Sequence, residues 1–386
     1  MKIWSCSIPL FLSLVWPSKD PTMVAIGWTI LLLLVVKRKD LLALRRWTGL
    51  AMTLFVLCAV SLVHIFYSGS WAELGDLVRI IPIAAALCFA RTATIEGLYS
   101  TFFCVGILNV ASLPLIEQGY FADVFALLHA RTLSESYGRH SGLFLNVSTL
   151  GIFSVGWLLL AMALFFKNGF KTHIALTAIL STVLLVASGG KTQVVALGCV
   201  VSVWVLSTLI RGRPILAAVL LAPILTPLVL HAGGVIYVHQ ITKLYNVIEY
   251  GSSAVSSVQG RLDLWQDFFR IWLNDPLWTI FGAPKLMLDA VGNTYDSDLI
   301  WLILRYGVLA SFGYVAFLSF VLFRGSMKRS PLLPLTAALI VMGFSIGVMT
   351  AFQMSFFYWV VLLTTLQTPT PWQVKADRKR KYVFAH

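Results

Sequence analysis

The longest polar stretch of this chain covers residues 231–299 and reads HAGGVIYVHQITKLYNVIEYGSSAVSSVQGRLDLWQDFFRIWLNDPLWTIFGAPKLMLDAVGNTYDSDL. Hydrophobic runs and short connectors make up almost everything else, so this is the one long segment that can carry chemistry in water. It contains Arg261, Asp296 and Asp298, and Arg305 lies just inside the hydrophobic run that follows. The rest of the chain is therefore expected to hold this loop in place.

The composition indicates a protein that crosses a membrane several times. Hydrophobic residues make up 59% of the 386 residues and charged residues 12%, and the mean hydropathy is +0.85. A soluble domain carries about 25% charged residues, so an ordinary soluble enzyme is excluded. The five cysteines lie inside apolar runs, which favours buried small side chains over a disulfide or zinc framework.

A helix needs roughly 20 apolar residues to cross a bilayer, and fewer where the bilayer thins. We therefore expect an all-α polytopic membrane protein, with one integral membrane domain over 1–386 and about twelve spans. The run at 3–16 lacks the small-residue cleavage site of a signal peptide and is kept as a short first span. The expected spans are 3–16, 22–36, 47–67, 77–91, 95–116, 143–166, 172–188, 192–210, 214–231, 298–323, 331–350 and 352–367.

The distribution of charge predicts the orientation of these spans. With both termini inside, the inner connectors hold far more Lys and Arg than Asp and Glu, whereas the outer connectors are net acidic. This pattern follows the positive-inside rule. The formal net charge of +13 therefore reflects orientation in the membrane and not nucleic-acid binding.

Two outer loops are long, at 117–142 and 232–297. Within the second, residues 261–274 have helical periodicity with one apolar and one polar face, and Pro276 closes the helix. Such a helix lies along the membrane surface or against the bundle. Its apolar face contains Leu262, Trp265, Phe269 and Trp272, and its polar face contains Asp263, Asp267, Arg270 and Asn274.

Because the outer face is net acidic, its few cations are candidates for a function. Arg131 and Arg139 lie in the sequence RTLSESYGRHSG, which ends at Gly142. Arginine binds phosphates and carboxylates through a planar fork of N–H donors, which suits an anionic substrate. The alternative is local pairing with Glu135 or Asp123.

The turn SGGKTQ at residues 188–193 contains a Gly-Lys-Thr string. A phosphate-binding P-loop would need a glycine where Leu185 stands, and it would join a strand to a helix rather than two spans. We therefore reject a nucleotide site. Lys191 places a cation at the mouth of the bundle, or it is a snorkelling lysine in a tight turn.

The amphipathic helix at 261–274 carries two arginines. Arg270 follows Asp267 by three residues, so a surface ion pair is expected for it. Arg261 opens the predicted helix, where a cation opposes the helix dipole. This unfavourable position favours a functional role for Arg261.

Asp296 and Asp298 lie in GNTYDSDLIWLILRYG, where the loop re-enters the membrane. An ionisable group at membrane depth is a functional candidate, and a carboxylate there can accept a proton from an attacking hydroxyl. Asp298 and Arg305 are two helical turns apart and would share a face. The alternative for either aspartate is an ordinary helix N-cap.

No metal and no cofactor are expected. The seven histidines show no metal-ligand spacing. The acidic pair Asp296 and Asp298 has the spacing of a metal–diphosphate motif, but it lies on the outer side, where nucleotide sugars are normally absent.

The layout of the spans and four short patches resemble the O-antigen polymerase and ligase superfamily of Wzy-type and WaaL-type membrane glycosyltransferases. RHSGLFLN (139–146) is similar to the family's R-x-x-G-x-F-x-N sequence before a span, and SGGKTQ is similar to its small-residue turn with a basic residue. GRLDLWQDFFRIWLNDPLWTIFG (260–282) resembles its arginine helix. NTYDSDLIWLILRYGVLASFGY (293–314) resembles its re-entrant span, which carries a Tyr-Gly pair.

Two details of this resemblance distinguish polymerases from ligases. Wzy-type polymerases carry an arginine, ten residues and a glycine in each of two outer loops. Arg131 to Gly142 fits this spacing, whereas Arg270 to Gly282 has eleven intervening residues. Ligases typically carry a histidine near the start of the re-entrant span, and residues 293–298 contain none, which favours a polymerase.

The resemblance implies a GT-C-like, metal-independent glycosyltransferase that joins glycan repeat units carried on undecaprenyl diphosphate. Its products would be O-antigen, capsule or exopolysaccharide. It implies the bacterial cytoplasmic membrane, cytoplasmic termini and a periplasmic active face, with a chain-length regulator and a flippase as protein partners. The implied diphosphate-binding residues are Arg131, Arg139, Lys191, Arg261 and Arg305; the catalytic candidates are Asp296, Asp298 and Arg261; the structural glycines are Gly142 and Gly282.

Three alternatives remain open. A ligase differs only in the acceptor, which the sequence does not name. A flippase or other transporter would line its centre with charge along several spans, whereas only Arg79 and Arg305 are expected to be buried charges. A structural or chain-length-regulating partner would not need cations gathered on an acidic face.

Overall fold

The computed structural model describes most of the predicted spans and part of the long loop. The described residues are 7–16, 21–35, 58–70, 73, 80–118, 120, 141–144, 146–169, 171–210, 239–250, 256–285, 287–288, 297–344, 346–349 and 352–367. Helices make up 85% of these residues, which contain no strand. An all-α architecture is therefore confirmed for the part of the chain that the structure describes.

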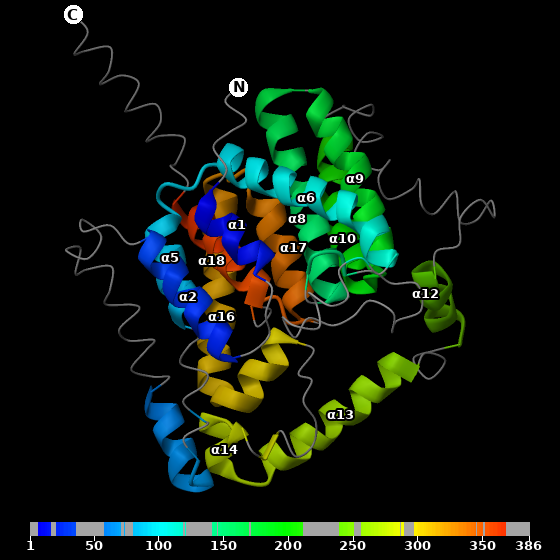
Figure 1. The fold of residues 1–386 in the computed structure, drawn as a ribbon. Helices are drawn as coiled ribbons and strands as arrows, with labels where there is room; N and C mark the ends of the chain where they lie inside the picture. The colour runs from blue at the N-terminus through cyan, green and yellow to red at the C-terminus, as the bar shows by residue number, and fades with distance from the viewer. Residues whose placement is uncertain are drawn as a thin grey trace, which may run out of the picture.

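The helices follow the expected order along the chain (Figure 1). A helix lies in or overlaps every predicted span except 214–231, which is outside the described residues. An unlabelled helix covers Cys58–Ser68. The labelled helices are α1 Ile8–Val15, α2 Pro21–Val35, α5 Ile80–Phe89, α6 Ile95–Glu117, α8 Val147–Asn168, α9 Thr172–Ser188, α10 Lys191–Ile210, α12 His239–Tyr250, α13 Ser256–Leu273, α14 Pro276–Phe281, α16 Asp298–Met327, α17 Leu333–Gly343 and α18 Phe352–Gln367.

Three of the described helices are long and apolar enough to cross a membrane. They cover Ile95–Ile116, Val147–Asn168 and Asp298–Met327. The other apolar helices among the described residues are shorter, so the structure supports a membrane protein with several helical spans.

Helix α8 is the centre of the main bundle. Every residue from Thr149 to Leu164 is buried, and α6, α9, α10, α17 and α18 all pack against it. Aromatic side chains fill the contact with α6 and α18: Phe102 stacks on Phe153 with ring centroids 4.7 Å apart, and Phe357 lies 4.4 Å from Phe102. Because α8 has no exposed polar face, it can only be stable inside such a bundle.

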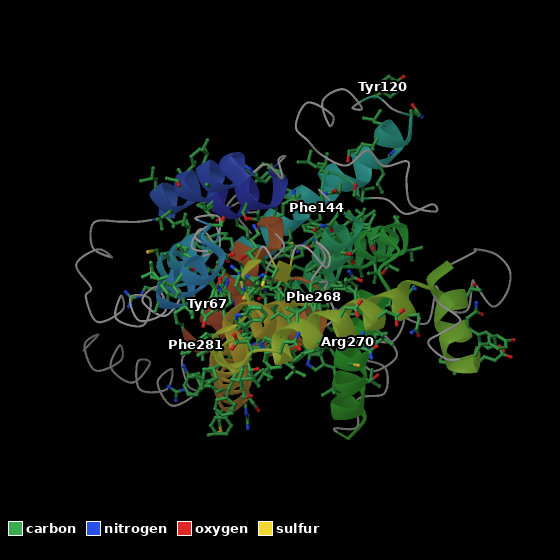
Figure 2. The ribbon with its side chains drawn as sticks, turned by 90° about the horizontal axis from the view of Figure 1, so that it is seen from below. Tyr67, Tyr120, Phe144, Phe268, Arg270 and Phe281 are labelled. Atoms are coloured by element: carbon green, nitrogen blue, oxygen red, sulfur yellow. The ribbon has the colours of Figure 1, made fainter. Side chains whose placement is uncertain are left out.

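A second layer lies below the main bundle in Figure 1. It consists of helix 58–68, α13, α14 and the first half of α16, and it has its own small core around Phe268, Trp272 and Leu304. Figure 2, which views the molecule from below, shows Phe268 and Arg270 on α13 and Phe281 at the end of α14. The long loop therefore folds back against α16.

Two predicted spans are interrupted in the structure. In the span 298–323, α16 is kinked at Gly307, where φ is 74° and ψ is −175°. In the span 331–350, α17 ends at Gly343 and residues 346–349 are not helical. The side chains of Ser297 and Asp298 bind backbone groups of this segment, as the next section describes, so they replace the hydrogen bonds that a continued helix would make.

Candidate functional site

Within the patch at 139–146, the described residues 141–144 form a turn held against α6. Gly142 has φ 58°, and a Cβ at this position would collide with the side-chain oxygen of Asn109. That oxygen accepts the Leu143 N–H at 2.8 Å, and the Asn109 amide donates to the Val105 carbonyl at 2.9 Å. Gly142 is therefore required by the close approach of α6 and by its left-handed backbone.

The rest of this patch starts α8. Phe144 is 2% exposed, and its ring lies 5.0 Å from the ring of Phe153. Asn146 caps the helix, because its side-chain oxygen accepts the Thr149 N–H at 2.7 Å. Gly, Phe and Asn of the pattern thus have structural roles, while Arg139 lies outside the described residues.

The turn at 188–193 is tied to the same end of α8. Gln193 is 2% exposed, and its amide donates to the Ser148 carbonyl at 3.1 Å. A Cβ on Gly190 or Gly151 would collide with the Gln193 side chain, so two glycines make room for this contact. Lys191 is the first residue of α10 and is half-buried. The structure therefore brings Lys191 and the 141–146 turn to one end of the bundle.

The arginine helix differs from its predicted form at the start. Helix α13 begins at Ser256, so Arg261 lies inside the helix and not at its first turn. The prediction that Arg261 opposes the helix dipole at the helix start was wrong. The position of the Arg261 side chain lies outside the described residues.

The faces of α13 agree with the predicted amphipathic pattern except at Leu262, which was assigned to the apolar face but is 44% exposed. Asp263, Asp267 and Arg270 are exposed, and Arg270 donates to Asp267 at 3.5 Å in the expected surface ion pair. Phe268, which was not assigned to the apolar face, is the fully buried residue of this helix at 0% exposure. Trp272 is 8% exposed beside it.

The start of α16 is fastened to the end of α17. Ser297 caps α16 by accepting the Ile300 N–H at 3.3 Å, and its hydroxyl donates to the Phe344 carbonyl at 2.8 Å. Asp298 is 1% exposed. Its Oδ2 accepts the N–H groups of Val348 at 2.9 Å and Met349 at 2.7 Å. The N-cap role belongs to Ser297, and Asp298 holds the non-helical segment.

Arg305 is buried in an ionic cluster of three side chains. It is 1% exposed, and Glu73 and His64 are 0% and 1% exposed. Arg305 Nη1 donates to Glu73 Oε2 at 2.9 Å and to the Ala283 carbonyl at 3.0 Å. Both Glu73 oxygens accept the Lys285 N–H at 2.9 Å.

His64 completes this cluster from helix 58–68. Its Nε2 lies 2.8 Å from the Gly282 carbonyl, and its Nδ1 lies 3.4 Å from Arg305 Nη1. A carbonyl can only accept, so Nε2 carries the proton, and Nδ1 then faces Arg305 as an acceptor. This assignment gives a neutral imidazole between the Gly282 carbonyl and the guanidinium.

Two backbones cross beside the cluster. Gly282 has φ 85° and Gly307 has φ 74°. A Cβ on Gly282 would collide with the Arg305 carbonyl group, and a Cβ on Gly307 would collide with the Ile280 carbonyl group. The Ala283 N–H donates to the Leu304 carbonyl at 2.6 Å. Gly307, the glycine of the Tyr-Gly pair, thus permits the close packing of α14 against α16.

Asp298 and Arg305, which were expected to share a helix face, both lie in the helical part of α16 before the kink at Gly307. Their partners differ: Asp298 binds the segment after α17, whereas Arg305 binds Glu73 and the turn after α14. Arg131, Arg139, Asp296 and Arg79 lie outside the described residues. Among the described residues no group of three or more His, Cys, Asp and Glu converges.

No protein-family model matches this chain, and it matches no curated protein. The candidate site therefore depends on the residues themselves.

Sequence reasoning missed Glu73 and His64. Glu73 lies 232 positions from Arg305 in the chain, and His64 lies 241 positions from it. The available signal was that Glu73 is an acid near the end of an apolar run, and that His64 lies within the run. Neither signal identifies Arg305 as the partner, because the contacts of His64 and Glu73 with Arg305 depend on how the segment around helix 58–68 packs on the end of α14.

Proposed function

We propose that this protein is a membrane glycosyltransferase that joins undecaprenyl-diphosphate-linked glycan repeat units at the outer face of a bacterial cytoplasmic membrane. In the proposed reaction, a hydroxyl of the acceptor sugar attacks the anomeric carbon of the donor chain. The C–O bond to the lipid diphosphate breaks, and the lipid diphosphate leaves with the bonding electrons. The hydroxyl proton passes to a carboxylate, for which Asp296 and Asp298 are the candidates.

The observation that supports this proposal is the contact between the Lys191 turn and the start of α8. The Gln193–Ser148 hydrogen bond ties this turn to the first turn of α8. In the chain, Arg139 stands eight positions before Val147, the first residue of α8, and Arg131 stands sixteen positions before it. In Figure 1 the start of α8, the α9–α10 turn and helices α13 and α14 are on the same side of the bundle. Lys191 and Arg261, two of the cations proposed to bind the diphosphate, belong to these elements.

Cations at this end would lower the barrier of the reaction. Negative charge grows on the leaving diphosphate in the transition state, and fixed donors in a water-poor site stabilise such charge strongly. Arginine adds a planar fork that matches phosphate oxygens. We propose Arg131, Arg139, Lys191 and Arg261 as these donors, with both termini in the cytoplasm and about twelve spans.

The profile of surface polysaccharide from a deletion strain tests the function. Loss of a polymerase leaves single repeat units attached to the acceptor. Loss of a ligase leaves no attached glycan, and loss of a transporter leaves intermediates that are not exported. We expect the single-repeat profile; either of the others would contradict the proposal.

Arginine variants in the complemented deletion strain test the proposed donors. We expect Arg131→Ala and Arg261→Ala to remove long chains while leaving the amount of protein in the membrane unchanged, because each loses a diphosphate contact. Arg270→Ala is the matched control on the same helix, because its side chain is exposed and paired with Asp267. Normal chain lengths in both Arg131 and Arg261 variants would rule out the donor assignment.

A further inference from the structure

The three side chains of the ionic cluster come from distant parts of the chain and converge on one turn. Glu73 binds the Lys285 N–H, His64 binds the Gly282 carbonyl, and Arg305 binds the Ala283 carbonyl. Residues 282–285 follow α14 directly. These contacts fasten the end of the α13–α14 unit to α16, to helix 58–68 and to Glu73, which follows that helix in the chain.

Among the described residues, the charges of the cluster balance each other. Arg305 and Glu73 are joined at 2.9 Å, and the tautomer assigned above makes His64 neutral. A cation whose charge is already balanced by a carboxylate in a dry environment has little electrostatic attraction left for a further anion. A substrate diphosphate approaching Arg305 would also meet the negative charge of Glu73.

The geometry leaves little room for a ligand at Arg305. The three side chains are at most 1% exposed. The Gly282 backbone lies against Arg305 and the Gly307 backbone lies against Ile280, so close that neither glycine tolerates a Cβ. The core around Phe268, Trp272 and Leu304 continues from this crossing to α13, so a shift of the turn would move the helix that carries Arg261.

We propose that Arg305, Glu73 and His64 are positioning residues that lock the α13–α14 unit onto the kinked α16, and that Arg305 does not bind the substrate diphosphate. The link to chain elongation rests on the proposed function, whereas the lock itself does not. Glu73 and His64 would act only through Arg305 and the 282–285 turn.

Paired substitutions test the lock through the physics of buried ion pairs. Removing one partner leaves a buried charge uncompensated, whereas removing both charges is often nearly neutral. We therefore expect Arg305→Met and Glu73→Gln each to lower the Tm of the purified protein in detergent, by roughly 5–10 °C. In the double variant Glu73→Gln/Arg305→Met the Tm should recover by more than half, because the glutamine oxygen still accepts the Lys285 N–H.

Chain elongation in the complemented deletion strain separates positioning from binding. We expect the double variant to regain long chains that Arg305→Met loses. A double variant that recovers its Tm but makes no long chains would show that the guanidinium itself is needed, and would overturn the proposal. Additive losses of Tm would overturn it as well.

The exposed pair on α13 is the matched control. Asp267 and Arg270 are 56% and 71% exposed, so Asp267→Asn, Arg270→Met and their double variant should leave the Tm and the chain lengths unchanged. If the deletion strain shows normal polysaccharide, the proposed function fails, but the Tm series still decides whether the lock exists.

Discussion

At the scale of single residues, burial alone does not assign a function to an ionisable group. Asp298 and Arg305 are both 1% exposed, and both lie in the part of α16 before the kink at Gly307. Their partners give them different roles: Asp298 accepts two backbone N–H groups of residues 348–349, and Arg305 is paired with a carboxylate. The Asp298 carboxylate holds the non-helical segment after α17 by these two hydrogen bonds. Because this structural role occupies Asp298, Asp296 is the stronger candidate for the proposed proton acceptor.

The variant Asp298→Asn distinguishes a structural role of Asp298, in binding residues 348–349, from a catalytic role as proton acceptor. An asparagine oxygen can accept the same two N–H groups, but the amide cannot take a proton from a hydroxyl. We expect this variant to fold and to support long chains, while Asp298→Leu, which lacks both acceptors, lowers the amount of protein in the membrane. Gel profiles of the polysaccharide and immunoblots of membranes measure the two effects. Short chains together with a normal amount of the Asp298→Asn variant in the membrane would identify Asp298 as the proton acceptor.

At the scale of elements, α14 and α16 are joined by backbone contacts that only glycine permits. Gly307 has φ 74° and ψ −175°, a conformation that costs an ordinary residue about 1–3 kcal/mol, and a Cβ there would also collide with the Ile280 carbonyl. Gly169 has nearly the same backbone, φ 75° and ψ −174°, but open space around it. Gly313 lies in a regular part of α16 with open space.

These three glycines form a graded series for measurement. We expect Gly313→Ala to be neutral or slightly stabilising, since alanine is favoured in a helix by about 1 kcal/mol. Gly169→Ala should lower the free energy of unfolding by the backbone strain alone, about 1–3 kcal/mol. Gly307→Ala should lower it clearly more, because the collision with the Ile280 carbonyl adds to the strain. Thermal unfolding of the purified variants in detergent gives the order. Equal losses of stability in the Gly169→Ala and Gly307→Ala variants would mean that α14 does not pack closely against the kink of α16.

The helices also show which features of the fold can be predicted from sequence patterns and which cannot. Periodicity predicted the polar face of α13 and the Arg270–Asp267 pair, because both depend on local spacing. It did not identify Phe268 as the fully buried residue, since the face that packs is chosen by α14 and α16. The break after Gly343 was missed for a similar reason: the groups that satisfy its backbone belong to Ser297 and Asp298, which are about 50 positions away in sequence.

At the scale of the whole molecule, a few polar contacts at the ends of α8 determine which helix ends lie together. The end of α8 is tied to the start of α6 by the Lys167–Glu96 ion pair at 2.6 Å, and the start of α8 is tied to the start of α10 by Gln193. The two ends of α8 are thus chemically different. Lys167 and Lys171 flank one end, which the positive-inside rule assigns to the cytoplasm. The other end is on the same side of the bundle as α13 and α14 (Figure 1).

Cysteine labelling in intact cells tests this orientation directly. In a background with the five native cysteines replaced, Asn274→Cys would stand at the exposed end of α13, and Asn168→Cys would stand at the exposed end of α8. We expect a membrane-impermeant maleimide to label Asn274→Cys in intact cells and Asn168→Cys only after the cytoplasmic membrane is permeabilised. The reverse result would place the α13–α14 unit in the cytoplasm, away from an outward-facing lipid-linked substrate, and would remove the basis of the proposed reaction.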